Sequence, residues 1–151
     1  MTRSAESPEC VFCAATVTDD GRQLLVHESP LCYVILNLYP YNAGHLLVVP
    51  RRHVDSLTAL TRDELHEVAR LTQVAEQVLM DAFQPQGINV GLNLGRPAGA
   101  GIVDHLHVHL VPRWTGDTNF MSIVGEVRVM PEELPRTADK LRPMFGRLGG
   151  D

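Results

Sequence analysis

The stretch HLHVHLVPRW, residues 105–114, places three of the chain's seven histidines at alternate positions. Side chains two residues apart in a β-strand point to the same face. His105, His107 and His109 should therefore share one face of a strand that we predict over residues 106–111. Each imidazole needs a partner, because burying a polar group without one costs roughly 1–3 kcal/mol. The stretch therefore predicts a functional surface on a β-sheet.

The spacing of these histidines leaves two chemical interpretations open. All three could bind one metal ion, as three imidazoles do in some zinc enzymes. Alternatively, one could attack a substrate while its neighbours orient it or stabilise charge. Alternate side chains on a strand lie about 6.5–7 Å apart at their Cα atoms. This separation makes convergence on one ion awkward and favours the second interpretation.

A glycine-rich loop precedes the histidines and favours an anionic ligand. Gly95, Gly99 and Gly101 allow backbone conformations in which N–H groups line an anion-binding concavity. A phosphate between this loop and the histidines would lie within reach of a neutral imidazole. Such an imidazole can attack phosphorus and form a phosphoramidate that is readily hydrolysed. The sequence thus predicts chemistry on a phosphate group.

Hydrophobic periodicity elsewhere predicts four more strands and one long helix, over residues 23–27, 31–36, 45–49 and 88–94 for the strands and 61–83 for the helix. Thr61 and Glu64 form a T-x-x-E capping box at the start of that helix. The tail after Pro131 should be partly helical. Few helices on a meandering antiparallel sheet are an α+β pattern, and we expect residues 1–151 to form a single domain.

Composition restricts the partners. The formal net charge is -5 at pH 7, without the basic character of a nucleic-acid-binding protein. No apolar run approaches the roughly 18 residues that span a bilayer, and the polar N-terminus lacks the plan of a signal peptide. We therefore expect a cytoplasmic protein that binds neither nucleic acid nor membranes. In this setting the C-x-x-C motif of Cys10 and Cys13 indicates a metal or redox pair, whereas Cys32 should be a core residue.

The H-x-H-x-H motif followed by Pro112 and Arg113 resembles the signature of the histidine triad (HIT) superfamily of nucleotide hydrolases and transferases. The resemblance extends upstream to Gly44-His45, Pro50-x-x-His53 and Asn93-x-Gly95. The stretches NLYPYNAGHLLVVP and GLNLGRPAGAG are most similar to those of diadenosine tetraphosphate phosphorylase-type members from actinobacteria. The resemblance implies a HIT-like fold: a five-stranded antiparallel sheet with one long and one shorter helix, which pairs into a homodimer with a ten-stranded sheet.

The resemblance also implies a reaction on an adenine nucleotide derivative, such as a dinucleoside polyphosphate. His107, the middle histidine, would attack the α-phosphorus and carry a covalent nucleotidyl intermediate, which water or phosphate then resolves. His109 would bind the α-phosphate, and His45 would support the nucleophile. Further nucleotide-binding residues implied by the resemblance surround the base, the ribose and the phosphates: Ile35, Leu38, Asn37, Asn93, Gly99, Ala100 and Gly101.

Many relatives bind a structural zinc ion through the C-x-x-C motif and two histidines, which here match Cys10, Cys13, His53 and His105. The N-terminal segment of about residues 8–16 would then belong to the metal site. Four protein ligands close the coordination shell, as in structural zinc sites. The alternative is that both cysteines are free thiols on a flexible terminus.

One departure from the family pattern concerns the residues before the triad. Many members carry G-Q-[ST] there, whereas this chain reads Ala100-Gly101-Ile102, without an amide or hydroxyl side chain. The choice between water and phosphate as acceptor therefore stays open. Two other functions stay open as well: a purine nucleoside phosphoramidase or aminoacyl-adenylate hydrolase, and a non-catalytic nucleotide-binding or zinc-stabilised interaction module.

Overall fold

The protein is built around a five-stranded antiparallel sheet with the strand order β1-β2-β3-β5-β4. The computed structural model describes residues 10–95, 104–117 and 133–148. Its strands are β1 (Leu25–Glu28), β2 (Cys32–Leu36), β3 (Leu46–Pro50), β4 (Gly87–Gly91) and β5 (Val108–Arg113). The predicted α+β class with this number of antiparallel strands is confirmed.

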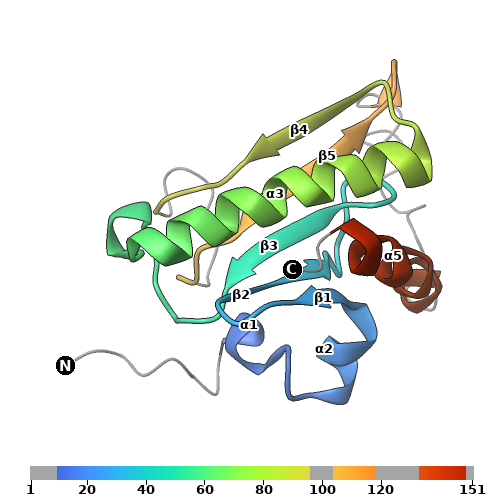
Figure 1. Cartoon of the computed structure of the whole chain (residues 1–151). Helices are drawn as coiled ribbons and strands as arrows, with labels where there is room; N and C mark the ends of the chain where they lie inside the picture. The colour runs from blue at the N-terminus through green and yellow to red at the C-terminus, as the bar shows by residue number, and fades with distance from the viewer. Residues whose placement is uncertain (1–9, 96–103, 118–132, 149–151) are drawn as a thin grey trace.

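Helices cover one face and one edge of the sheet (Figure 1). They are α1 (Val11–Ala14), α2 (Asp19–Leu24), the 3-10 turn η1 (Leu57–Ala59), α3 (Arg62–Phe83) and α5 (Leu134–Leu148). The long helix α3 crosses the sheet, α5 packs near β1, and α1 and α2 lie at the β1 edge (Figure 1). Among the helices described, none has the length and apolar character to cross a membrane.

Two apolar clusters pack on opposite faces of the sheet. The larger cluster joins one face to α3 and α5, and its members include Val34, Leu46, Val48, Leu110, Leu71, Leu79 and Phe145. The smaller cluster covers the other face with Tyr33, Ile35, Leu47 and Val49, together with Ala15 and the partly buried Phe12. Leu47 pairs with His109 across β3 and β5, so that histidine shares the face of the smaller cluster. The two long helices therefore leave this face to the histidines.

The N-terminus of α3 shows the predicted capping box. The Thr61 hydroxyl accepts from the Glu64 backbone N–H at 3.1 Å, and the Glu64 carboxylate accepts from the Thr61 N–H at 2.8 Å. The same carboxylate also accepts two hydrogen bonds from the Arg52 guanidinium, both at 2.8 Å. The Arg52 bonds are the main cause that lowers the pKa of Glu64 to about 2. A buried carboxylate thus ties the start of α3 to the segment after β3.

Replacing Glu64 with alanine should lower the free energy of unfolding by about 2–4 kcal/mol near neutral pH, since it removes part of the helix cap and two charge-assisted hydrogen bonds from Arg52. The folded-state pKa of about 2 lies below the ordinary 4.5, so this stabilisation is present above pH 4.5 and is lost as pH falls toward 2. Urea unfolding of both proteins across this pH range measures the difference. A difference in unfolding free energy that stays constant across this pH range contradicts the assignment of the stabilisation to the ionised Glu64 carboxylate.

Four strand boundaries differ from the prediction by two or more residues, three of them because the predicted strand is too long at that end. Gln23 and Leu24, predicted as strand, belong to α2, whose N-cap Thr18 accepts from the Gly21 N–H at 3.1 Å. The predicted strand 106–111 begins instead at Val108, because the Leu106 N–H donates to the Val54 carbonyl at 2.7 Å and not to β3. The predicted strand 88–94 ends early, because its last pair joins Gly91 to His109 and residues 104–107 offer β4 no partner.

The strand β5 also runs further than predicted, through Pro112 to Arg113. Proline lacks a backbone donor and is tolerated in a sheet only where that donor has no partner strand. The Pro112 carbonyl faces the β3 side, where it accepts from the Asn42 side chain, and β3 pairs with β5 only as far as Leu110. The missing donor of Pro112 therefore leaves no gap in the ladder.

Candidate functional site

His107 lies immediately before β5 with a half-buried ring. Its Nδ1 is 2.8 Å from the His105 backbone carbonyl oxygen. A carbonyl only accepts, so this bond assigns the proton to Nδ1 and leaves the lone pair on Nε2. Burial lowers the pKa of His107, which favours the neutral ring. Nε2 of His107 therefore carries the lone pair that a nucleophile needs.

His45 and His109 form a second, opposite arrangement. The Tyr41 backbone N–H donates to His45 Nδ1 at 3.1 Å, and His45 Nε2 lies 2.9 Å from His109 Nδ1. A backbone N–H only donates, so His45 carries its proton on Nε2 and donates it to His109 Nδ1. The proton of His109 must then lie on its Nε2. Burial lowers the pKa of His45 to about 3 and that of His109 to about 4, which keeps both rings neutral near pH 7.

Five aromatic rings form a continuous row on this face of the sheet. Successive ring centroids lie 4.7 Å apart for Phe12 and His107, 4.9 Å for His107 and His109, 5.1 Å for His109 and His45, and 5.3 Å for His45 and Tyr41. Only His107, His109 and His45 were predicted as site residues. Phe12 could have been suspected from its place between the two cysteines, whereas nothing in the sequence singles out Tyr41.

The other predicted nucleotide-binding residues differ in position. The Asn37 amide nitrogen lies 3.4 and 3.5 Å from the two ring nitrogens of His45, and Ile35 belongs to the smaller cluster on the same face. Leu38 is 48% exposed in the loop after β2, and Asn93 is exposed beyond the end of β4. Gly99, Ala100 and Gly101 lie outside the described residues. The structure thus brings Asn37 to His45 and places Ile35 on the same face of the sheet.

The predicted metal ligands converge. The ligand atoms of Cys10, Cys13, His53 and His105 all lie within 4.8 Å of one another. Cys13 Sγ is 3.2 Å from His53 Nδ1 and 3.6 Å from His105 Nδ1, and Cys10 Sγ is 3.4 Å from His105 Nδ1. A tetrahedron with zinc bonds of roughly 2.0–2.3 Å has edges of about 3.3–3.8 Å. Three of the six ligand-atom distances thus lie near these edges, and the four residues are close enough together to hold one metal ion.

The outer contacts of the cluster also suit a metal ligand. His105 is 1% exposed, and its Nε2 is 2.7 Å from the Pro50 carbonyl oxygen. That carbonyl accepts the Nε2 proton and leaves the Nδ1 lone pair directed at the cysteines. A ligating histidine ordinarily donates its other N–H to a carbonyl in this way.

The metal cluster and His107 are linked directly. The ring of His105 belongs to the cluster, while its backbone carbonyl accepts from His107 Nδ1. Phe12, between the two cysteines, packs its ring on His107, and its own carbonyl accepts from the Tyr33 hydroxyl at 2.7 Å. A change in the cluster would therefore reach the ring of His107 through two contacts.

Residues 20–116 match the model of the HIT domain family, and the chain belongs to that family. It is 45% identical over 144 residues to a protein of Mycobacterium tuberculosis named AP-4-A phosphorylase, covering 95% of this chain and 74% of that protein. It is 31% identical over 121 residues to a bis(5'-adenosyl)-triphosphatase of Dictyostelium discoideum, covering 76% and 80%.

A solved structure adds a comparison for the metal site. The crystal structure of a zinc-bound histidine triad family protein from Mycobacterium smegmatis superposes with a TM-score of 0.72 at 26% sequence identity. The match covers 93% of this chain and 96% of that one. The five-stranded fold predicted from the triad motif is thus shared with a zinc-bound member of the family.

Proposed function

We propose that the protein transfers a nucleotidyl group from a dinucleoside polyphosphate, such as diadenosine tetraphosphate, by way of His107. The observation that carries this proposal is the pair of opposite tautomers: a lone pair on His107 Nε2 beside a proton on His109 Nε2, with ring centroids 4.9 Å apart. One ring is prepared to attack phosphorus and the other to donate a hydrogen bond to phosphate oxygen. The names of the relatives supply the substrate class.

The reaction needs two displacements at the α-phosphorus. His107 Nε2 forms a bond to phosphorus while the bond to the bridging oxygen breaks, and the distal nucleotide leaves with that electron pair. The His109 Nε2–H donates to the oxygens on which negative charge develops. Water or phosphate then attacks the phosphorus, the nitrogen–phosphorus bond breaks, and the acceptor loses a proton. The electron pair of the broken nitrogen–phosphorus bond returns to His107 Nε2, while the other ring proton stays on Nδ1, hydrogen-bonded to the His105 carbonyl.

We propose a structural zinc ion on Cys10, Cys13, His53 and His105. The donor set closes the coordination shell with protein atoms, as expected of a structural zinc site. A bound zinc ion would hold His105 in place, and with it the backbone carbonyl that orients His107. A cytoplasmic location, where the thiols stay reduced, suits such a site.

Product analysis with diadenosine tetraphosphate tests the proposed reaction. With inorganic phosphate as acceptor the products are ADP and ATP, whereas with water they are AMP and ATP. The similarity to the M. tuberculosis phosphorylase leads us to expect dependence on phosphate. Turnover confined to nucleoside phosphoramidates or aminoacyl adenylates would assign the alternative activity. Tight AMP binding without any turnover would indicate a binding module.

We also propose that the protein forms a homodimer through β4, with a ten-stranded sheet. This strand ends the sheet order, so one of its edges has no partner strand within the described chain. Val90 on β4 is 52% exposed, and Leu65 on α3 is 48% exposed. Sedimentation analysis of the protein and of a Val90→Lys variant tests the proposal. A monomer at micromolar concentration contradicts it.

A further inference from the structure

The tautomer of His45 depends on a loop. The N–H that donates to His45 Nδ1 belongs to Tyr41, between β2 and β3. The Tyr41 side chain stacks on His45 but is 67% exposed. The position of that N–H therefore depends on what anchors the loop to the rest of the site.

Asn42, the next residue, supplies the anchor. Its side chain is nearly buried, and its amide nitrogen donates to the Pro112 carbonyl at 2.9 Å and to the Asp117 carboxylate at 2.8 Å. Its backbone carbonyl accepts from the His45 N–H at 3.2 Å. Both amide hydrogens of Asn42 are thus used to tie the loop to the end of β5.

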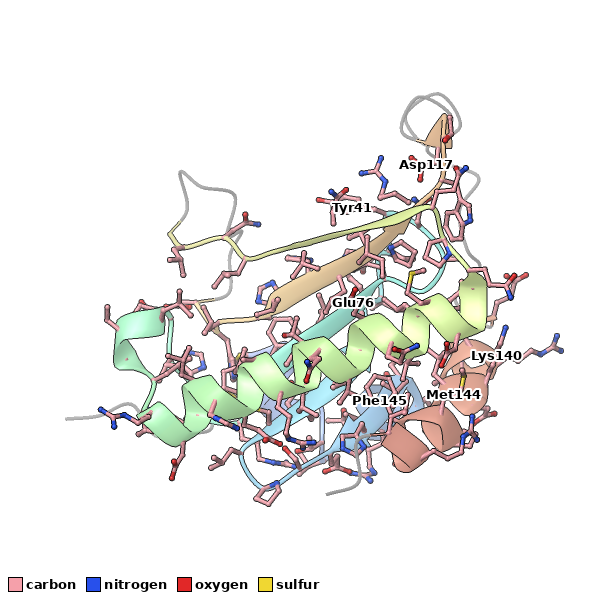
Figure 2. The ribbon with its side chains drawn as sticks, turned by 45° about the horizontal axis from the view of Figure 1, so that its top comes forward. Tyr41, Glu76, Asp117, Lys140, Met144 and Phe145 are labelled. Carbon is pink, nitrogen blue, oxygen red and sulfur yellow. The ribbon has the colours of Figure 1, made fainter. Side chains whose placement is uncertain are left out.

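Asp117 is itself held in place. Its side chain is 13% exposed and forms an ion pair with Arg113 at 2.8 Å. It also accepts from the Trp114 backbone N–H at 2.7 Å. Figure 2 shows Tyr41 and Asp117 above α3, on the side of β4 and β5, with Asp117 near the end of β5. Since His109 lies on β5, the Asn42 bonds fix the loop that carries Tyr41 relative to the strand that carries His109.

We propose that Asn42, held by Asp117, is a positioning residue for the histidine site. It holds the Tyr41 N–H on His45 Nδ1 and thereby keeps the proton of His109 on Nε2, without a contact to substrate. Its effect on turnover rests on the proposed function. Its effect on the tautomers concerns the protein without substrate and is measured separately.

The Asn42→Asp variant tests this role. It replaces a donor by a carboxylate facing two acceptors, the Pro112 carbonyl and the Asp117 carboxylate, so the loop should detach. Two-dimensional nitrogen-15 NMR of the imidazoles should then show mixed tautomers for His45 and His109. The kcat for diadenosine tetraphosphate should fall on the order of 10- to 100-fold, with a much smaller change in KM.

The pH profile separates positioning from a general loss of structure. As pH is lowered, the new carboxyl of Asn42→Asp gains a proton and can donate to Asp117 again. Its kcat should therefore recover in part relative to the wild type. Asn42→Ser, which shortens the side chain without adding charge, should lose the single tautomers but show no such recovery. If Asn42→Asp does not fold, the tautomers and kcat of Asn42→Ser test the proposal instead.

The matched control is Thr18→Ala, which removes the α2 cap and lowers stability away from the loop. It should keep the tautomers and kcat of the wild type. Wild-type tautomers in both Asn42 variants, or kcat within about 2-fold of the wild type, would overturn the inference. If the wild type turns over no dinucleotide while the Asn42 variants lose their tautomers, the proposed function fails and the positioning role stands.

Discussion

Replacing His107 with asparagine is expected to lower kcat for diadenosine tetraphosphate by at least about 10⁴-fold, the scale seen when a covalent nucleophile is removed. The asparagine amide can still donate to the His105 carbonyl, as His107 Nδ1 does at 2.8 Å. The peptide and the metal cluster should therefore keep their arrangement. What disappears is the lone pair that attacks phosphorus. Steady-state kinetics with the purified variant, together with its metal content, measure this effect.

His66→Asn is the matched control for the nucleophile variant. His66 is exposed on α3, on the sheet face opposite the histidine row, so the same substitution should leave kcat unchanged. Residual turnover by His107→Asn within about 10-fold of the wild type would contradict covalent catalysis by that residue.

Among the substitutions proposed, replacing Cys13 with serine should lower the stability of the fold most. Cys13 Sγ lies close to both His53 and His105, so its removal takes away one of four ligands. Binding of a structural zinc ion contributes roughly 10 kcal/mol or more to folding in small metal domains. We expect the variant to lose its metal and to unfold at a midpoint at least about 10 °C lower. Metal analysis and calorimetry measure both effects.

Cys32→Ala is the matched control for the metal variant. Cys32 is fully buried in the larger cluster, and burial is the main cause that raises its pKa to about 12, so the thiol stays protonated. The control should keep its full metal content despite a cavity in the core. A metal content near zero in wild-type protein purified without added metal would remove the proposed site.

Hydrophobic periodicity predicted most of the fold because the apolar positions repeat clearly. The start of the helix predicted over residues 61–83 agrees with the structure, since Thr61 and Glu64 form a capping box that is visible in the sequence. The helix α2 was missed although Thr18 followed by two acidic residues is a helix-start signal, because the neighbouring apolar residues suggested a strand. Strand ends were predicted poorly because they depend on partner strands distant in the chain.

The candidate site was predictable only where its residues form local motifs in the sequence. The triad and the C-x-x-C motif are recognisable from their spacing. The structure brings His53 beside Cys13, as the family resemblance implies, but it places His45 beside His109, whereas the resemblance assigns His45 to the support of His107. The anchor at Asn42 joins segments 70 residues apart, and the row of rings joins segments 64 residues apart at His45 and His109 and 95 residues apart at Phe12 and His107. No local pattern encodes such contacts. Opposite tautomers also follow only from which backbone groups face each ring.

Covalent catalysis by His107 is tested most directly by intact-mass and peptide analysis of protein that is mixed rapidly with diadenosine tetraphosphate and quenched in alkali, where a nitrogen–phosphorus bond on histidine persists. We predict one adenylyl group, assigned to His107 by fragmentation of the peptide that carries both His107 and His109, and absent from the His107→Asn variant. Turnover without any adenylylated protein, or an adenylyl group on His109, would contradict it.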